Sequence, residues 1–162
     1  IGGLGHIALQ FLNAWGCRVT AFTSSDDKKQ KALSMGAHDV LNTKNPAELT
    51  AAAGRFDLIL TTVNVKLDWN AYIATLRPKG RLHFLGVPLE PLDINVFPLI
   101  ANQCTVSGSP VGSPAGIATM LSFAQQHKIE PVVEIFRFDQ VNEALARLSS
   151  GQAKYRVVLS NQ

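Results

Sequence analysis

The sequence predicts an α/β fold built on a doubly wound parallel sheet. Two observations carry this prediction. Segments rich in β-forming residues alternate along the chain with amphipathic stretches of roughly ten residues, which is typical of repeated strand–helix–strand units. In addition, no repeat, low-complexity tract or linker interrupts the alternation, so the 162 residues are expected to form one domain, 1–162.

The first stretch predicts a helix from Leu4 to about Trp15. Its apolar residues recur at helical spacing, and Gly16 ends it. A strand is expected over 17–23, where β-forming residues predominate. Ser24 and the three residues after it offer helix caps, which predicts a second helix that ends before Gly36.

The same alternation predicts the remaining elements. We expect strands at 39–41, 56–61, 81–87, 104–107, 132–137 and 155–159, and helices at 46–53, 69–76, 97–102, 114–124 and 141–148. The strand at 56–61 is almost continuously apolar, so it is expected to be buried on both faces. A turn is expected at 78–80 and a proline-containing loop at 88–95.

The composition argues against several classes of function. The net charge of +3 comes from basic residues scattered singly or in pairs, so we expect no nucleic-acid-binding surface. No apolar run is long enough to cross a bilayer and no signal peptide precedes Ile1, so we expect no membrane association. Cys17 and Cys104 lie far apart in apolar, strand-like contexts, which is typical of buried, reduced thiols in a cytoplasmic protein.

A glycine-rich loop, Gly2-Gly3-Leu4-Gly5, directly precedes the first helix. Gly2 and Gly5 have the spacing of the last two glycines of G-x-G-x-x-G, in which amides at a helix N-terminus meet a pyrophosphate. The loop therefore indicates dinucleotide binding. The first glycine of the motif and the buried strand before it would lie ahead of Ile1, so we expect a fold truncated at its first strand. Either that strand lies upstream or another segment fills its place.

The strand after the first helix ends at Thr23, where NAD-binding domains usually carry Asp or Glu for the ribose hydroxyls. Ser24, Ser25 and Lys28 follow instead. Hydroxyls and a cation can bind a 2′-phosphate, so these residues predict NADP(H) rather than NAD(H). The alternative is that the serines only cap the helix and Lys28 is a solvated residue. The missing carboxylate at Thr23 also argues against an S-adenosylmethionine-dependent methyltransferase.

Several motifs together resemble the zinc-type, medium-chain alcohol dehydrogenases. They are Gly-Gly-Leu-Gly-His at 2–6, the Thr-Ser-Ser loop with Lys28, Met35-Gly36-Ala37, residues 82–88, Gly108-Ser109-Pro110-Val111-Gly112 and Lys154-Tyr155-Arg156-Val157. The similarity covers essentially the whole chain and is greatest to the NADP-dependent branch that includes cinnamyl-alcohol-dehydrogenase-like enzymes. It implies the Rossmann-like cofactor domain of a two-domain oxidoreductase, in which hydride passes between the nicotinamide and an alcohol or aldehyde bound to zinc.

The resemblance also implies which residues contact the nicotinamide dinucleotide. They are Gly2, Gly3, Leu4 and Gly5 along the pyrophosphate; Thr23, Ser24, Ser25 and Lys28 at the selectivity loop; Thr61, Thr62 and Val63 at a ribose; Gly86, Val87, Ser109, Pro110 and Val111 at the nicotinamide; and Arg156 at a phosphate. For Arg156 the alternative is an ordinary surface residue on a strand. Residues near 87–107 are implied to help form a homodimer, since sheet edges invite pairing.

The chain departs from that family because the half with the Cys, His and Glu ligands of zinc is not in it. His6, His38, His83 and His127 show no ligand spacing and are expected to be structural, so this chain is expected to hold no metal and no catalytic residue. Without zinc, which is expected only in the intact protein, the chain should bind cofactor but not turn over. Two alternatives stay open: a zinc-free quinone reductase of the same superfamily, and a non-catalytic NADPH-sensing domain.

Overall fold

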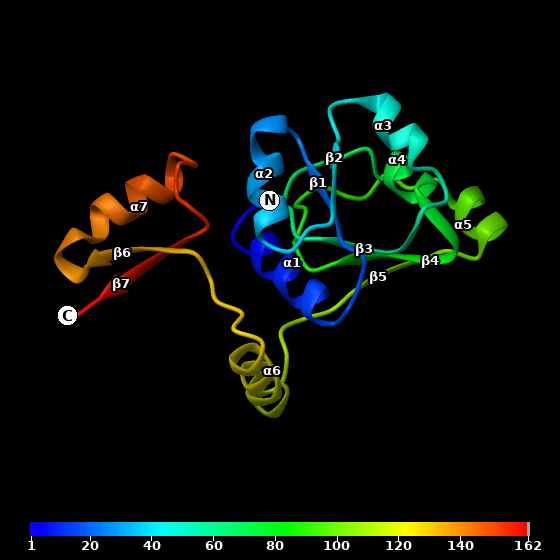
Figure 1. The fold of residues 1–162 in the computed structure, drawn as a ribbon. Coiled ribbons are helices and arrows are strands. Elements are labelled where there is room, and N and C mark those ends of the chain that lie inside the picture. The colour runs from blue at the N-terminus through cyan, green and yellow to red at the C-terminus, as the bar shows by residue number, and fades with distance from the viewer. Residues whose placement is uncertain (162) are drawn as a thin grey trace.

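The computed structural model describes residues 1–161, in which helices and strands alternate (Figure 1). The strands are β1 (Thr20–Thr23), β2 (Asp39–Asn42), β3 (Phe56–Thr61), β4 (Leu76–Phe84), β5 (Thr105–Gly108), β6 (Val133–Arg137) and β7 (Arg156–Ser160). The α-helices are α1 (Gly5–Ala14), α2 (Lys29–Ser34), α3 (Pro46–Ala51), α4 (Trp69–Ala74), α5 (Val96–Asn102), α6 (Pro114–Gln126) and α7 (Val141–Ser149). Short 3-10 turns, η1 (Asp26–Lys28) and η2 (Phe138–Gln140), precede α2 and α7.

All strand pairings among residues 1–161 are parallel, which confirms the predicted α/β class. The strands form three ladders: β1 with β2, then β3-β4-β5, then β6 with β7. No ladder joins β1 to β3 within the described part of the chain, so no other segment fills the gap expected there. Parallel neighbours need a crossover, and a helix between each pair of strands supplies it.

Two apolar clusters hold the ladders and helices together. The larger one joins α4 to the middle of the three-stranded ladder through Trp69, Ile73 and the fully buried Leu82. The smaller one packs Leu9 of α1 and Ala32 of α2 against the first ladder. The helices α1, α2 and α4 therefore each bury apolar residues against a sheet, as an amphipathic pattern predicts. No helix within residues 1–161 is long and apolar enough to span a membrane.

The segment from β6 to β7, with α7 between them, forms a C-terminal unit that lies apart from the other elements in Figure 1. Contacts with α1 fix it in place. The Gln10 side chain donates to the Glu130 carbonyl oxygen at 3.0 Å, and the buried His6 accepts from the Val132 backbone N–H at 3.1 Å. The His6 ring also stacks on Tyr155, with centroids 4.5 Å apart. These contacts bring β7 close to the start of the chain.

Three sequence predictions were wrong in detail. Cys17 is exposed, because the chain leaves α1 in a loop there and β1 begins only at Thr20. Leu58 of β3 is 45% exposed, so this apolar strand is not covered on both faces. The turn expected at 78–80 lies inside β4: Phe56 pairs with Leu76 but Leu58 pairs with Arg81, so the residues between bulge out of the ladder.

Candidate functional site

The glycine-rich loop presents bare backbone at the start of α1. The helix has no side-chain cap and no acidic residue in its first turn, so nothing in the loop offsets the positive end of its dipole. A Cβ atom added at Gly2 would meet no atom within 4 Å, which means that this face of the loop is open. An anion could therefore approach the backbone of the loop closely.

Gly3 lies against residues from the other end of the chain. A Cβ atom at Gly3 would lie 2.8 Å from the Tyr155 carbonyl oxygen and 3.2 Å from Nε of Arg156. Only glycine leaves room for this contact. The guanidinium of Arg156 is thus placed beside the loop, where it adds positive charge next to the helix N-terminus.

The end of β3 contacts both the glycine-rich loop and the end of β4. A Cβ atom at Gly5 would lie 3.3 Å from Oγ1 of Thr62, and one at Gly86 would overlap the Val63 carbonyl oxygen. The Thr61 carbonyl oxygen accepts hydrogen bonds from the amides of Leu85 and Gly86 at 2.9 and 3.0 Å. Three segments that the sequence singled out separately are therefore in direct contact at the carboxyl ends of parallel strands, where ligands bind in α/β sheets.

Thr61 has one further property that matters for a ligand. Its side-chain hydroxyl is buried and has no hydrogen-bond partner among residues 1–161. An unsatisfied buried hydroxyl costs free energy, and such groups in a native fold usually find a partner in a ligand or an ordered water. The residues around the loop therefore fit a polar ligand that would supply the hydrogen-bond partner that the Thr61 hydroxyl lacks.

The selectivity loop follows β1 and has two layers. Thr23 lies underneath, where its hydroxyl donates to the Ser25 carbonyl oxygen at 3.3 Å and accepts from the Ser25 amide at 3.4 Å. Ser24 and Lys28 are exposed above it, and Lys28 forms no ion pair with any of residues 1–161. Thr23 therefore shapes the loop, while the other side chains are available to a ligand.

Ser25 and Asp27 determine the local charge of this loop. The Ser25 hydroxyl makes no hydrogen bond of ordinary geometry, but it lies near the Asp27 carboxylate and is the largest cause of the lowered pKa of that carboxyl group. The nearby Lys28 and Lys31 lower the pKa of Asp27 further. The loop thus combines the Lys28 cation with an Asp27 carboxylate that is ionised at neutral pH.

The segment after β5 lies at the same carboxyl edge of the three-stranded ladder. Ser109 follows the strand directly, and its amide donates to the Phe84 carbonyl oxygen at 3.3 Å. Beyond it the chain is open to solvent, since Val111 is 92% exposed. Val87, which follows β4, is also largely exposed. Both exposed segments stand at the carboxyl edge of the same ladder.

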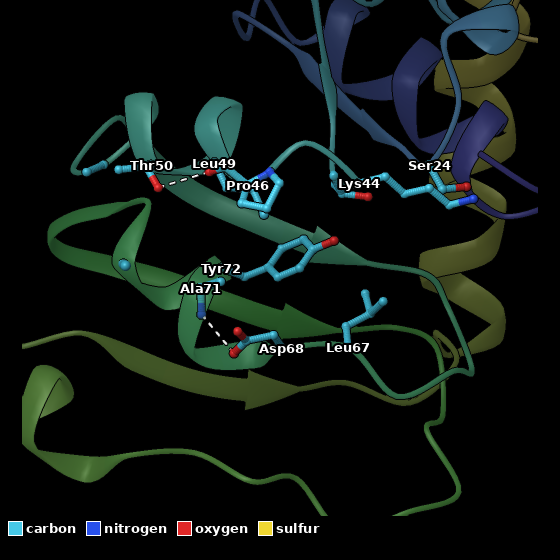
Figure 2. A pocket seen from close by; sticks show the side chains of 12 residues that line it. Ser24, Lys44, Pro46, Leu49, Thr50, Leu67, Asp68, Ala71 and Tyr72 are labelled. Carbon is cyan, nitrogen blue, oxygen red and sulfur yellow. Dashed lines mark hydrogen bonds between the residues drawn. The ribbon is translucent and has the colours of Figure 1, made fainter.

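Sequence reasoning missed a pocket of about 530 Å³ between α3 and α4 (Figure 2). Ser24 and Thr43, at the ends of β1 and β2, lie on one side of it, and Leu49, Leu67 and Tyr72 form apolar walls. Burial raises the pKa of the Tyr72 hydroxyl, so this side chain is neutral at physiological pH. Sequence analysis had placed Tyr72 only within the helix expected at 69–76. The neighbouring carboxyl ends of two strands were the available signal for a pocket.

No group of three or more His, Cys, Asp or Glu side chains that could hold a metal ion comes together among residues 1–161. Each histidine has a contact within the fold instead. His38 accepts from the Val19 amide at 3.0 Å, His83 contacts two serine hydroxyls, and His127 stacks on Phe123 with centroids 4.1 Å apart.

Residues 3–126, which include the glycine-rich loop from Gly3 onward and the ends of β1, β3 and β4, match the family model described as zinc-binding dehydrogenase. The chain belongs to this family. The region matched is the cofactor-binding part of zinc-type alcohol dehydrogenases, which confirms the resemblance inferred from the motifs.

Relatives and solved structures of zinc-type dehydrogenases agree with this assignment. The aldehyde reductase AdhA of Synechocystis sp. is 63% identical over 161 residues, which cover 99% of this chain and 48% of that protein. A cinnamyl alcohol dehydrogenase from Sorghum bicolor matches with a TM-score of 0.92 at 36% identity, over 98% of this chain and 45% of that one. CAD from Helicobacter pylori, complexed with NADP(H), matches with a TM-score of 0.82 at 30% identity, over the same shares. The chain spans about half the length of the curated relatives it matches.

Proposed function

We propose that this chain is the NADP(H)-binding domain of a zinc-dependent alcohol dehydrogenase that interconverts alcohols and aldehydes. The observation that carries the proposal is the direct contact of the glycine-rich loop, the end of β3 and the end of β4 at one sheet edge. The relatives add support, since one is named an aldehyde reductase and one solved neighbour holds NADP(H). When bound, NADP(H) accepts or donates the hydride in such a reaction.

In this proposal the loop and its neighbours hold the cofactor. The amides of Gly2, Gly3, Leu4 and Gly5 face the pyrophosphate, and Arg156 neutralises part of its charge. Thr61, Thr62 and Val63 lie along a ribose, and the buried Thr61 hydroxyl gains its missing partner there. Gly86, Val87, Ser109, Pro110 and Val111 present backbone groups to the nicotinamide from the ends of β4 and β5.

The selectivity loop favours NADP(H) over NAD(H) in this proposal. Ser24, Ser25 and Lys28 contact the 2′-phosphate, and Thr23 holds the loop from below. Each hydrogen bond to a charged phosphate contributes about 1.5 to 3 kcal/mol, which corresponds to a preference of at least about tenfold. The pocket beside Ser24 suits a flat apolar ring, so we assign it to the adenine.

The rest of the enzyme lies outside the residues of this chain in our proposal. Residues 1–162 form one cofactor domain, and a second domain holds the zinc and the substrate. The chain alone exposes 10613 Å², whereas a compact protein of its mass exposes about 7,900 Å². This excess supports a partner domain. We expect the isolated chain to be inactive because it has no Lewis acid to polarise a carbonyl.

We also propose that the enzyme is a cytoplasmic homodimer. Both cysteines are free thiols, as expected in a reducing compartment. The edge strand β5 has an unpaired side among the described residues, and the adjacent α5 exposes Phe97 and Ile100 by 73% and 70%. An open strand edge beside an apolar helix face favours pairing with a second copy.

The decisive experiment is a titration of the full-length protein with NADPH and NADH at matched ionic strength, repeated for Lys28→Ala. NADPH should bind at least about tenfold more tightly, and the substitution should remove most of that margin. Lys31→Ala, an exposed lysine on the following helix, is the matched control and should leave the margin intact. Equal affinity for both nucleotides would contradict the NADP(H) assignment, and binding of neither would overturn the proposal.

A further inference from the structure

His83 connects two serine hydroxyls at the carboxyl end of the central ladder. It lies on β4 directly opposite Ser107 of β5, and its Nδ1 atom is 2.9 Å from the Ser107 hydroxyl. Its Nε2 atom is 3.0 Å from the hydroxyl of Ser109, which is the first residue after the strand. One imidazole thus bridges the end of β5, at Ser107, and the segment that follows the strand, at Ser109.

The segment 109–112 has little else to hold it. The amide of Ser109 donates to the Phe84 carbonyl oxygen at a rather long 3.3 Å, and no other backbone hydrogen bond involves these four residues within the described chain. The His83 contact is the only side-chain hydrogen bond to the segment among residues 1–161. With Val111 almost fully exposed, the position of the segment depends strongly on this contact.

The chemistry of imidazole suits it to this task. In the neutral ring one nitrogen donates and the other accepts, whereas a serine hydroxyl can do either, so both contacts are satisfied in either tautomer. The neighbouring Leu82 is fully buried on the opposite face of β4, so His83 projects from the other face of the strand. An apolar residue at 83 would leave both hydroxyls without this partner.

We propose that His83 is a positioning residue that acts through Ser109 to hold residues 109–111 in the conformation that receives the nicotinamide. This inference rests on the proposed function, because it takes the segment after β5 as the nicotinamide contact. In this inference His83 contacts neither cofactor nor substrate. Because His83 already restricts residues 109–111 in the free protein, these residues lose less conformational entropy when NADPH binds. The resulting gain in affinity comes only from the nicotinamide end of the cofactor.

A matched pair of variants of the full-length protein tests the inference. The amide nitrogen of His83→Gln stands near the position of Nε2 and keeps the contact with Ser109, whereas that of His83→Asn stands near Nδ1 and keeps only the contact with Ser107. We expect His83→Asn and Ser109→Ala each to weaken NADPH binding about three- to tenfold, and His83→Gln to bind nearly as wild type does. The double variant His83→Asn/Ser109→Ala should be no weaker than either single one.

Adenosine 2′,5′-bisphosphate, which lacks the nicotinamide, separates this inference from the proposed function. All variants should bind it as tightly as the wild type does. Three outcomes would each overturn the role of His83 while leaving the proposed function standing. They are an equal loss of affinity for both ligands in His83→Asn, an unchanged NADPH affinity in that variant, and additive effects of His83→Asn and Ser109→Ala. A wild-type protein that binds neither ligand would overturn the proposed function and this inference with it.

Discussion

The Nε2 atom of His6 accepts a hydrogen bond from the backbone N–H of Val132 at 3.1 Å, although 126 positions separate the two residues. Because Nε2 accepts, the ring proton of the neutral histidine is on Nδ1, which faces the Gly2 carbonyl oxygen at 3.3 Å. His6 therefore ties the glycine-rich loop to the segment that leads into the C-terminal unit. A protonated ring would direct an N–H at the Val132 amide and break this connection.

The first prediction concerns the pH dependence of this connection. Burial lowers the pKa of His6, and Arg156 lowers it further, against opposing hydrogen bonds to Gly2 and Gly3. The folded-state pKa lies below the unfolded value of about 6.5, so the stability that His6 contributes is fully present above about pH 6.5 and is lost as the pH falls through the folded value. Hydrogen exchange of the Val132 amide, corrected for the intrinsic rate, should therefore be faster near pH 5 than near pH 7.5.

His6→Phe provides the comparison for this measurement. It removes both the hydrogen bond and the titration, so protection of the Val132 amide should be low at both pH values. His127→Gln changes a histidine at the end of α6 and should leave the pH dependence as in the wild type. A Val132 amide whose protection does not vary between the two pH values would contradict the assigned role of His6.

The second prediction separates folding from binding within the glycine-rich loop. Gly2→Ala adds a methyl group to open space, whereas Gly3→Ala places one 2.8 Å from the Tyr155 carbonyl oxygen. We expect Gly2→Ala to keep the wild-type melting temperature but to weaken NADPH binding at least about tenfold, because its methyl group would face the pyrophosphate. Gly3→Ala should lower the free energy of unfolding by about 1 to 3 kcal/mol. If Gly2→Ala binds NADPH normally, the pyrophosphate does not lie on this face.

The third prediction uses two buried threonines that differ in their hydrogen bonds. The Thr61 hydroxyl has no partner, whereas Thr75 donates to the Tyr72 carbonyl oxygen at 2.7 Å. Thr61→Val should therefore leave the cofactor-free protein as stable as wild type or slightly more stable, while Thr75→Val should lose about 1 kcal/mol. Thr61→Val should also weaken NADPH binding and Thr75→Val should not. Denaturant unfolding with and without NADPH measures both effects, and a destabilised Thr61→Val would show that the hydroxyl already has a partner.

The fourth prediction concerns assembly. Phe97 is 73% exposed on α5, the helix that precedes the edge strand β5, and a charge there would be buried if two copies pair through this part of the chain. Phe97→Asp should therefore convert the dimer into a monomer in sedimentation velocity while the fold is kept. Phe138→Asp changes a phenylalanine that is 55% exposed on η2, and it should leave the dimer intact. A wild-type monomer, or a dimer that survives Phe97→Asp, would contradict this interface.

Sequence alone determined the order and type of the elements. Strands and helices were predictable because the alternation of apolar residues and the caps and glycines at the ends are local properties of the chain. The start of α6 is one example, since the Ser113 hydroxyl accepts from the Gly116 amide at 3.2 Å and so caps the helix expected at 114–124. The parallel class followed from the helices between the strands. The combination of motifs between residues 2 and 157 was sufficient to identify the family.

Tertiary structure decided which of these local features meet. Sequence analysis named Arg156 and the glycine-rich loop separately, but only the packing of His6 on Tyr155 shows why they lie together. The contact between His83 and Ser109 had no sequence signal, because it joins side chains from β4 and from the segment after β5. For the pocket beside Tyr72, the only sequence signal was the neighbouring ends of two strands, and the walls come from the packing of α3 and α4. The exposure of Leu58 could not be inferred either. An apolar strand is buried only where other elements cover it, and that depends on how the whole chain packs.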